Sequence, residues 1–128
     1  MFRFLVTSEQ ASGSYTTMEL TVPPGEGANP HHHDEAEEQF YVLEGEVTFW
    51  VADRTIQASS GDFIHIPRGT VHSFENGTTY AKLLATFGPG TGIEKLFQEE
   101  GELLDERMAY GQETPIAPDG ATLHRRAE

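Results

Sequence analysis

The chain has 128 residues, no cysteine, and 21 acidic against 8 basic side chains, so its formal net charge is −13 with histidine neutral. Without cysteine it can form no disulfide, cysteine nucleophile, thiolate zinc site or iron–sulfur cluster, and its negative charge argues against nucleic acid, whose binding rests on Lys and Arg. No apolar run approaches the ~20 residues of a membrane span, and the first six residues lack the features of a signal peptide. We therefore expect one domain, located in the cytoplasm, that binds neither nucleic acid nor membrane.

Turn-forming residues divide the chain into short segments rich in Val, Ile, Phe, Tyr and Thr. The sequence contains 13 Gly and 7 Pro, and the pair Glu44-Gly45 marks a hairpin between two such segments. Strands separated by turn signals at intervals of about 8 to 12 residues predict an all-β sandwich or barrel. The expected strands cover residues 14–22, 39–43, 46–51, 55–58, 63–66, 72–75 and 81–87.

The last third of the chain has a different pattern. Apolar residues recur at helical spacing within residues 92–104, which predicts a short helix there. The final residues are mostly polar and include Pro and Gly, which is typical of an extended or poorly ordered tail. We therefore divide the chain into a β-barrel with a C-terminal helix over residues 1–110 and a tail over residues 111–128.

Three of the six histidines stand together, at positions 31 to 33. Taken alone, this segment is typical of a solvated polar loop or of a fragment of a purification tag. Side chains two apart on a strand share a face, however, so His31 and His33 can present their imidazoles to one point while His32 faces away. Glu38 can join them if the chain turns between, and His72 can reach the same point from across the barrel. Such a set of four ligands suits one divalent transition metal, Fe, Mn, Ni, Co, Cu or Zn, and leaves one or two coordination positions open.

The spacing of these residues resembles the two sequence motifs of the cupin superfamily. The first motif matches Gly25-x5-His31-x-His33-x4-Glu38-x6-Gly45, and the second matches Gly61-x5-Pro67-x-Gly69-x2-His72-x3-Asn76. The resemblance implies a single-domain double-stranded β-helix, or jelly-roll barrel, that forms a homodimer through its sheets. It also implies that the metal ligands inside the barrel are His31, His33, Glu38 and His72. Asn76 is expected to brace a loop through hydrogen bonds to the backbone.

The segments around both motifs are similar to those of the small cupins grouped with quercetin 2,3-dioxygenases. This resemblance favours a metal-dependent dioxygenase that acts on an aromatic or enol-type small organic substrate. Glu38 would then serve as a base for the substrate hydroxyl, because a carboxylate that loosens from a metal can accept a proton. The substrate pocket is expected to include Phe40, Val42, Phe63, His65 and Phe74, each of which also fits an ordinary core or surface role.

Two other classes of function are open from the sequence. A non-redox Lewis-acid metalloenzyme, such as a cyclase, isomerase or lyase, can use the same four ligands, and small stand-alone cupins include polyketide cyclases. A non-enzymatic cupin that binds a small molecule is the third class. The fold alone does not choose among them, because cupins share a barrel and not a reaction.

Overall fold

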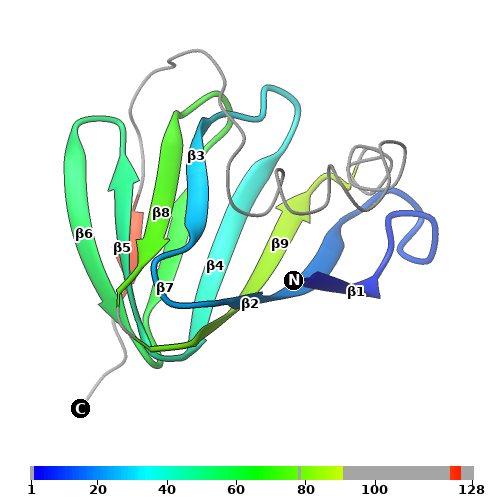
Figure 1. Cartoon of the computed structure of the whole chain (residues 1–128). Helices are drawn as coiled ribbons and strands as arrows, with labels where there is room; N and C mark the ends of the chain where they lie inside the picture. Colours follow the sequence, from blue (N-terminus) through cyan, green and yellow to red (C-terminus); the bar gives the residue numbers. More distant parts are fainter. Residues whose placement is uncertain (1, 78, 91–121, 125–128) are drawn as a thin grey trace.

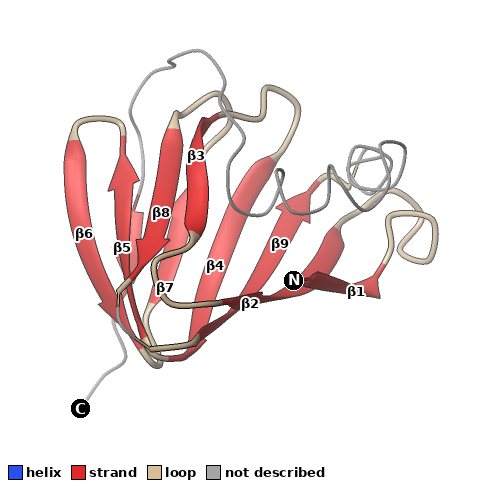
Figure 2. Ribbon diagram, viewed as in Figure 1, coloured by secondary structure: helices blue, strands red, loops and turns tan. Residues whose placement is uncertain are grey.

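The computed structural model describes residues 2–77, 79–90 and 122–124, and in these residues the chain forms strands joined by turns and loops (Figure 2). The described residues contain no helix, and therefore none that is long and apolar enough to span a membrane. The helix expected within residues 92–104 lies outside the described part of the chain. The strands are β1 (Phe2–Val6), β2 (Thr16–Val22), β3 (Gly27–His31), β4 (Glu37–Glu44), β5 (Glu46–Val51), β6 (Arg54–Ser59), β7 (Phe63–Ile66), β8 (His72–Asn76), β9 (Ala81–Gly88) and β10 (Thr122–His124).

The strands form two antiparallel sheets that curve around a common interior (Figure 1). One sheet has the order β1-β2-β9-β4-β7-β10 and the other has the order β3-β8-β5-β6. Consecutive strands often lie in different sheets, as β3 and β4 do, which is the connectivity of a jelly roll. The all-β prediction is therefore confirmed for the described residues. Strand β10 lies within the segment expected to be a tail, where it pairs with β7.

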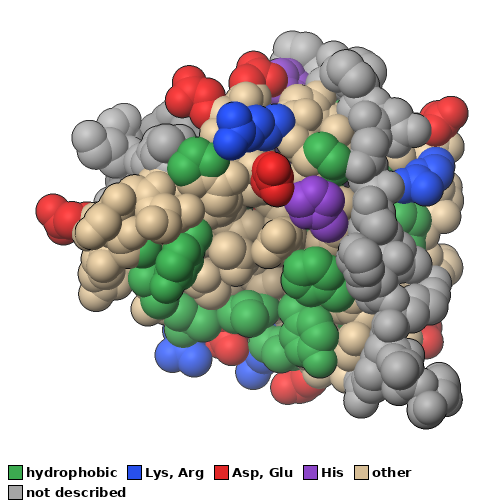
Figure 3. Space-filling model, turned by 180° about the vertical axis from the view of Figure 1, so that it is seen from behind, with side chains coloured by type: hydrophobic (Ala, Val, Ile, Leu, Met, Phe, Trp, Pro, Cys, Tyr) green, Lys and Arg blue, Asp and Glu red, His purple; other side chains and the backbone are tan. Residues whose placement is uncertain are grey.

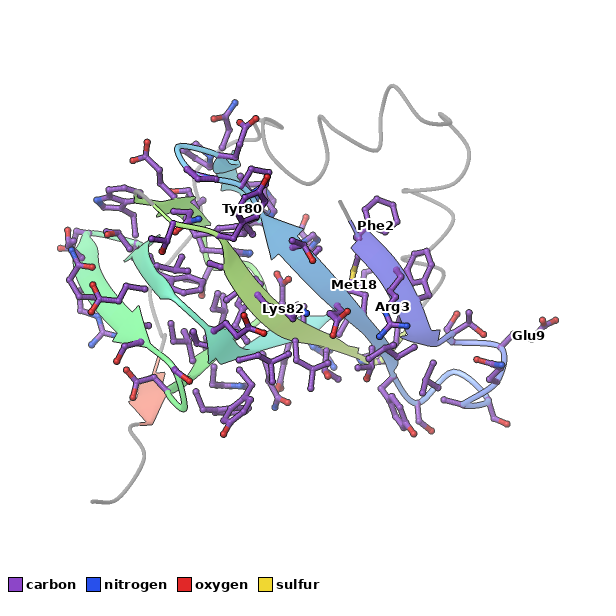
Figure 4. The ribbon with its side chains drawn as sticks, turned by 60° about the horizontal axis from the view of Figure 1, so that its bottom comes forward. Phe2, Arg3, Glu9, Met18, Tyr80 and Lys82 are labelled. Carbon is purple, nitrogen blue, oxygen red and sulfur yellow. The ribbon has the colours of Figure 1, made fainter. Side chains whose placement is uncertain are left out.

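Alternation of side chains builds the core between the sheets. In β2 and β9, every second residue is buried, and these inward residues face each other in pairs such as Met18 with Ala85 and Leu20 with Leu83. The other face of this six-stranded sheet is more polar, and it carries the Arg3–Glu19 ion pair (2.9 Å). Figure 4 shows Arg3 on β1 and Lys82 on β9.

Three phenylalanines join the two sheets at the centre of the core. Phe40 comes from the six-stranded sheet, whereas Phe49 and Phe74 are direct neighbours in the four-stranded sheet. Their ring centroids lie 5.1 to 5.6 Å apart, and all three side chains are buried. Tilted and edge-to-face rings at this separation attract one another beyond the effect of burial. This group of three phenylalanines therefore helps to hold the two sheets together.

Asn76 has the role that the sequence predicts. Its side-chain amide is buried and donates hydrogen bonds to the carbonyl oxygens of Val22 (2.8 Å) and Thr79. These contacts connect the end of β8 with the end of β2 and with the loop that leads into β9. The expectation of a bracing asparagine is confirmed.

Gly27 allows β3 to approach β8 closely. A Cβ atom at this position would overlap the carbonyl oxygen of Phe74 and would lie 2.8 Å from the Cα atom of Glu75. We therefore expect Gly27→Ala to lower the free energy of unfolding by about 2 kcal/mol or more, because backbone atoms must move to relieve the overlap. Gly77→Ala is the matched control, because a Cβ there has no atom within 4 Å. Urea denaturation of both variants measures the effect, and equal midpoints would contradict this account of Gly27.

Candidate metal centre

Three histidines and one glutamate converge inside the barrel from both sheets. His31 is the last residue of β3 and His72 is the first residue of β8, and the two are direct partners in the four-stranded sheet. Glu38 belongs to β4 in the other sheet, between Ile66 and Phe87. His33 lies in the loop between β3 and β4. One ligand atom from each of the four residues lies within 4.8 Å of the others.

The arrangement of these residues differs in detail from the sequence prediction. The sequence suggested that His31, His33 and Glu38 lie on adjacent strands, with His72 across the barrel. In the structure, His72 is the neighbour of His31, and Glu38 is the residue that lies across the interior. The reason is that the chain crosses from one sheet to the other between His33 and Glu38. His32 is half-buried rather than exposed, and its Nδ1 lies 2.8 Å from a carboxylate oxygen of Asp34.

Backbone carbonyl groups orient two of the histidines. The Nδ1 atom of His31 donates to the carbonyl oxygen of Asn29 (2.7 Å), and the Nδ1 atom of His72 donates to that of Thr70 (2.9 Å). A carbonyl oxygen can only accept, so each Nδ1 carries a proton and each Nε2 is directed to the centre of the cluster. Hydrogen bonds of this kind are typical of histidines that ligate metals, because they fix the tautomer and the orientation of the ring.

Glu38 is the only carboxylate in this cluster, and it is 4% exposed. Its Oε1 atom lies 2.8 Å from Nε2 of His72 and 3.4 Å from Nε2 of His33. Burial acts to raise the pKa of Glu38, but its interactions with His33 and His72 outweigh burial and hold that pKa well below its usual range. The carboxylate is therefore ionised at neutral pH and available as an anionic ligand.

The donor set fits a divalent transition metal. Within the described residues, the buried Nε2 atom of His33 has no hydrogen-bond partner, although buried polar atoms in proteins are nearly always paired. Burial, with a further contribution from His72, lowers the pKa of His31 to about 3, so this imidazole is neutral at physiological pH. Neutral imidazoles and a carboxylate are ligands that Fe, Mn, Co, Ni, Cu and Zn all accept. His31, His33, Glu38 and His72 would hold such an ion.

The expected pocket residues fall into two groups. Phe40, Val42 and Phe74 are buried in the hydrophobic core. Phe63 and His65 instead alternate along β7 with the buried residues Ile64 and Ile66, so they lie on the outer face of the sheet, away from the histidine cluster. Phe63 and His65 therefore face away from the interior, and the composition of the substrate pocket stays a prediction.

Phe63 and His65 face outward because only one face of the short strand β7 can point into the core. In the segment 63–66 the two isoleucines together are more apolar than Phe63 with His65, so burial of the isoleucines wins. The Nε2 atom of His65 lies 3.6 Å from the carboxylate of Glu37 on the outer face. Figure 3, which views the molecule from behind relative to Figure 1, shows that hydrophobic side chains also lie on the surface of the molecule.

The sequence analysis missed Phe87, which touches the cluster. Its ring centroid lies 5.2 Å from that of His33 with the rings nearly perpendicular, and Phe87 pairs with Glu38 across β4 and β9. A weak signal was present in the sequence, because Ala81, Leu83, Ala85 and Phe87 recur at every second position of β9 and all point inward, although Leu84 between them is also apolar. The alternation does not show which of these inward residues lies next to the histidines.

A jelly-roll barrel with three histidines and a glutamate in its interior defines a metal-binding type of cupin site. The match to a family model agrees: residues 18–87 fit the model described as a cupin domain, and the chain belongs to this family.

Several known proteins are similar to this chain. It is 31% identical over 102 residues to quercetin 2,3-dioxygenase of Bacillus subtilis and 30% identical over 104 residues to that of Aspergillus japonicus. These alignments cover 80% and 76% of this chain but only 30% and 29% of the two dioxygenases, so the chain spans about a third of their length. The structure of the polyketide cyclase RemF from Streptomyces resistomycificus is similar with a TM-score of 0.61 and 30% identity, over 68% of this chain and 63% of the cyclase.

Removal of single histidines tests the ligand set. We expect His31→Ala, His33→Ala and His72→Ala each to weaken metal binding by at least about 100-fold, because loss of a ligand costs more than the 10- to 100-fold typical of its outer-shell partners. Isothermal titration of the metal-free proteins with Co(II) measures the affinity. His65→Ala is the control, since that residue lies on the outer face, and it should bind as the wild type does. Wild-type affinity in His31→Ala and His72→Ala would show that the ligands are elsewhere.

The buried His31 should also make the metal-free protein sensitive to acid. Its pKa is about 3 in the folded chain against 6.5 for an ordinary histidine, so between these values the unfolded chain binds a proton that the folded chain does not. The free energy of unfolding therefore falls as the pH falls below about 6.5, by at most about 1.4 kcal/mol per pH unit from this group.

The comparison with His31→Gln isolates this effect from the other ionisable groups. Chemical denaturation between pH 5 and 7, in the presence of a chelator, should show a steeper loss of stability in the wild type than in the variant. Equal slopes for the two proteins would contradict the assignment of a neutral, buried His31.

Proposed function

We propose that this protein is a metal-dependent dioxygenase that acts on an aromatic or enol-type small organic substrate. The observation that carries the proposal is the cluster of three imidazoles and one carboxylate inside the barrel, with ligand atoms within 4.8 Å of one another. The similarity to two quercetin 2,3-dioxygenases, at 31% and 30% identity, supports this chemistry over the other uses of a cupin barrel.

The residues of the cluster have different roles in the proposed reaction. His31 and His72 are fixed by the carbonyl groups of Asn29 and Thr70, so they form the rigid part of the ligand set. Glu38 is ionised and is the only carboxylate of the cluster, which makes it the group that can accept the proton of a substrate hydroxyl. When bound, a redox-active divalent metal supplies electron transfer between the substrate and dioxygen.

Apolar side chains lie against the cluster. Phe40 lies 6.4 Å from His72 between ring centroids, Phe87 packs on His33, and both side chains are buried. Such walls suit a flat organic molecule better than a sugar or a phosphate, and they strengthen the electrostatic interactions of Glu38 by lowering the local dielectric constant.

A second candidate function is a non-redox Lewis-acid reaction such as cyclisation. The observation that favours it is the structural similarity to the polyketide cyclase RemF, at 30% identity over 68% of this chain. The same four residues would serve either reaction, so the identity of the metal and the need for dioxygen separate the two.

Metal analysis and oxygen uptake test the proposal together. Protein purified without a tag, chelator or nickel resin should contain close to one Fe, Mn, Ni, Co or Cu per chain. Addition of a flavonol or catechol should then cause oxygen uptake that is absent in His72→Ala and retained in His65→Ala. Bound zinc with turnover of a polyketide-type substrate under nitrogen would favour the cyclase alternative. Absence of metal after reconstitution would contradict both reactions.

The remaining expectations from the sequence stay predictions. They are a small-molecule substrate, a homodimer, a cytoplasmic location, and the division of the chain at residue 110. Size-exclusion chromatography with light scattering tests the homodimer directly.

A further inference from the structure

The three histidines of the cluster are not held in the same way. The rings of His31 and His72 are each fixed by a hydrogen bond from Nδ1 to the carbonyl oxygen two residues earlier in the chain. Among the described residues, the ring of His33 has no such bond, and its buried Nε2 atom has only the 3.4 Å contact with Glu38 and no well-aligned hydrogen bond. His33 also lies in a loop, whereas the other two lie at the ends of paired strands.

A hydrogen bond holds the backbone of His33 in place. The backbone N–H of Gly69 donates to the carbonyl oxygen of His33 (2.9 Å), which ties the loop to the turn before β8. This contact positions the Cα atom of His33 but does not by itself set the orientation of the ring. What orients the imidazole must therefore be sought among the groups that pack against the ring.

In the described part of the chain, the ring of His33 has three aromatic neighbours and one acidic neighbour, and three of these four groups belong to the cluster itself. These are the imidazoles of His31 and His72, at 5.1 and 5.6 Å between centroids, and the carboxylate of Glu38. Each of them would contact a bound metal, so its interaction with His33 changes when the metal binds. The fourth is Phe87, at 5.2 Å and 88°, whose side chain carries no ligand atom.

We infer that Phe87 is a positioning residue that orients His33 for metal binding by edge-to-face packing. Phe87 is itself held firmly: it is 2% exposed and pairs with Glu38 on one side and Thr16 on the other. Phe87 therefore lies on the six-stranded sheet, next to Glu38 and against the ring of His33. The inference rests on the proposed metal-binding function of the cluster, and it adds a residue that contributes no ligand atom.

The test compares the loss of Phe87 with the loss of another core phenylalanine. Phe87→Leu and Phe87→Met remove the ring but keep an apolar side chain of similar size, and Phe49→Leu is the matched control, because the ring contacts of Phe49 are with Phe40 and Phe74. We expect both Phe87 variants to bind Co(II) about tenfold more weakly than the wild type, the lower end of the effect of removing a supporting partner. Phe49→Leu should lose stability to urea and keep its affinity for Co(II).

Two spectroscopic measurements separate positioning from a general loss of structure. The visible absorption spectrum of bound Co(II) should change in the Phe87 variants and not in Phe49→Leu, because only the former alter the orientation of a ligand. In the metal-free protein, the NMR signals of the His33 ring protons should shift when the ring current of Phe87 is removed.

The outcomes distinguish this inference from the proposed function. If the wild type binds Co(II) and His33→Ala does not, but the Phe87 variants match Phe49→Leu in affinity and spectrum, the positioning role is overturned while the metal site stands. If the wild type binds no Co(II), the proposed function fails. Unchanged NMR signals of the His33 ring in the metal-free Phe87 variants would overturn the positioning role as well.

Discussion

The hydrogen bond between His72 and Glu38 joins the two sheets at the point where the interior is most polar. His72 belongs to β8 and Glu38 to β4, and both side chains are almost completely buried. Polar groups so far from water are costly unless they are paired, so the local structure must place the two atoms within 2.8 Å. The registers of β8 and β4 follow from this constraint, because a slip of one residue would turn either side chain to the outer face.

The core below this bond is what allows such a polar cluster. Phe40 and Phe74 each lie two residues from a ligand on the inward face of the same strand, and with Phe49 they form a closely packed group. The apolar layer sets the separation of the sheets, and the next inward position on each strand then carries Glu38 or His72 at that separation. The opposite side of the cluster is bounded by the loop that bears His33, so the site combines two rigid histidines with one that depends on packing.

The prediction of strands succeeded where the turn signals were strong. The segments 46–51 and 63–66 coincide with β5 and β7, and the hairpin at Gly45 joins β4 to β5. Strands β1 and β10 were not predicted. β10 is short and pairs with β7, which lies far away in the sequence, whereas β1 pairs with the next strand, β2. In β7 the strand was predicted but its inward face was not, since Phe63 and His65 compete with two isoleucines for the interior.

The sequence by itself determined the all-β class and the identity of the four clustered residues, because both depend on local spacing: turn residues between short apolar segments, and the intervals of two repeated motifs. Only the tertiary structure decided that His72 lies beside His31 and Glu38 lies opposite. It also decided that Phe87 packs on the ring of His33, whose Nε2 atom has no hydrogen bond from the described residues. These features depend on which strand enters which sheet and at what register. That choice is made by the burial of the whole core, and no single segment of the sequence contains it.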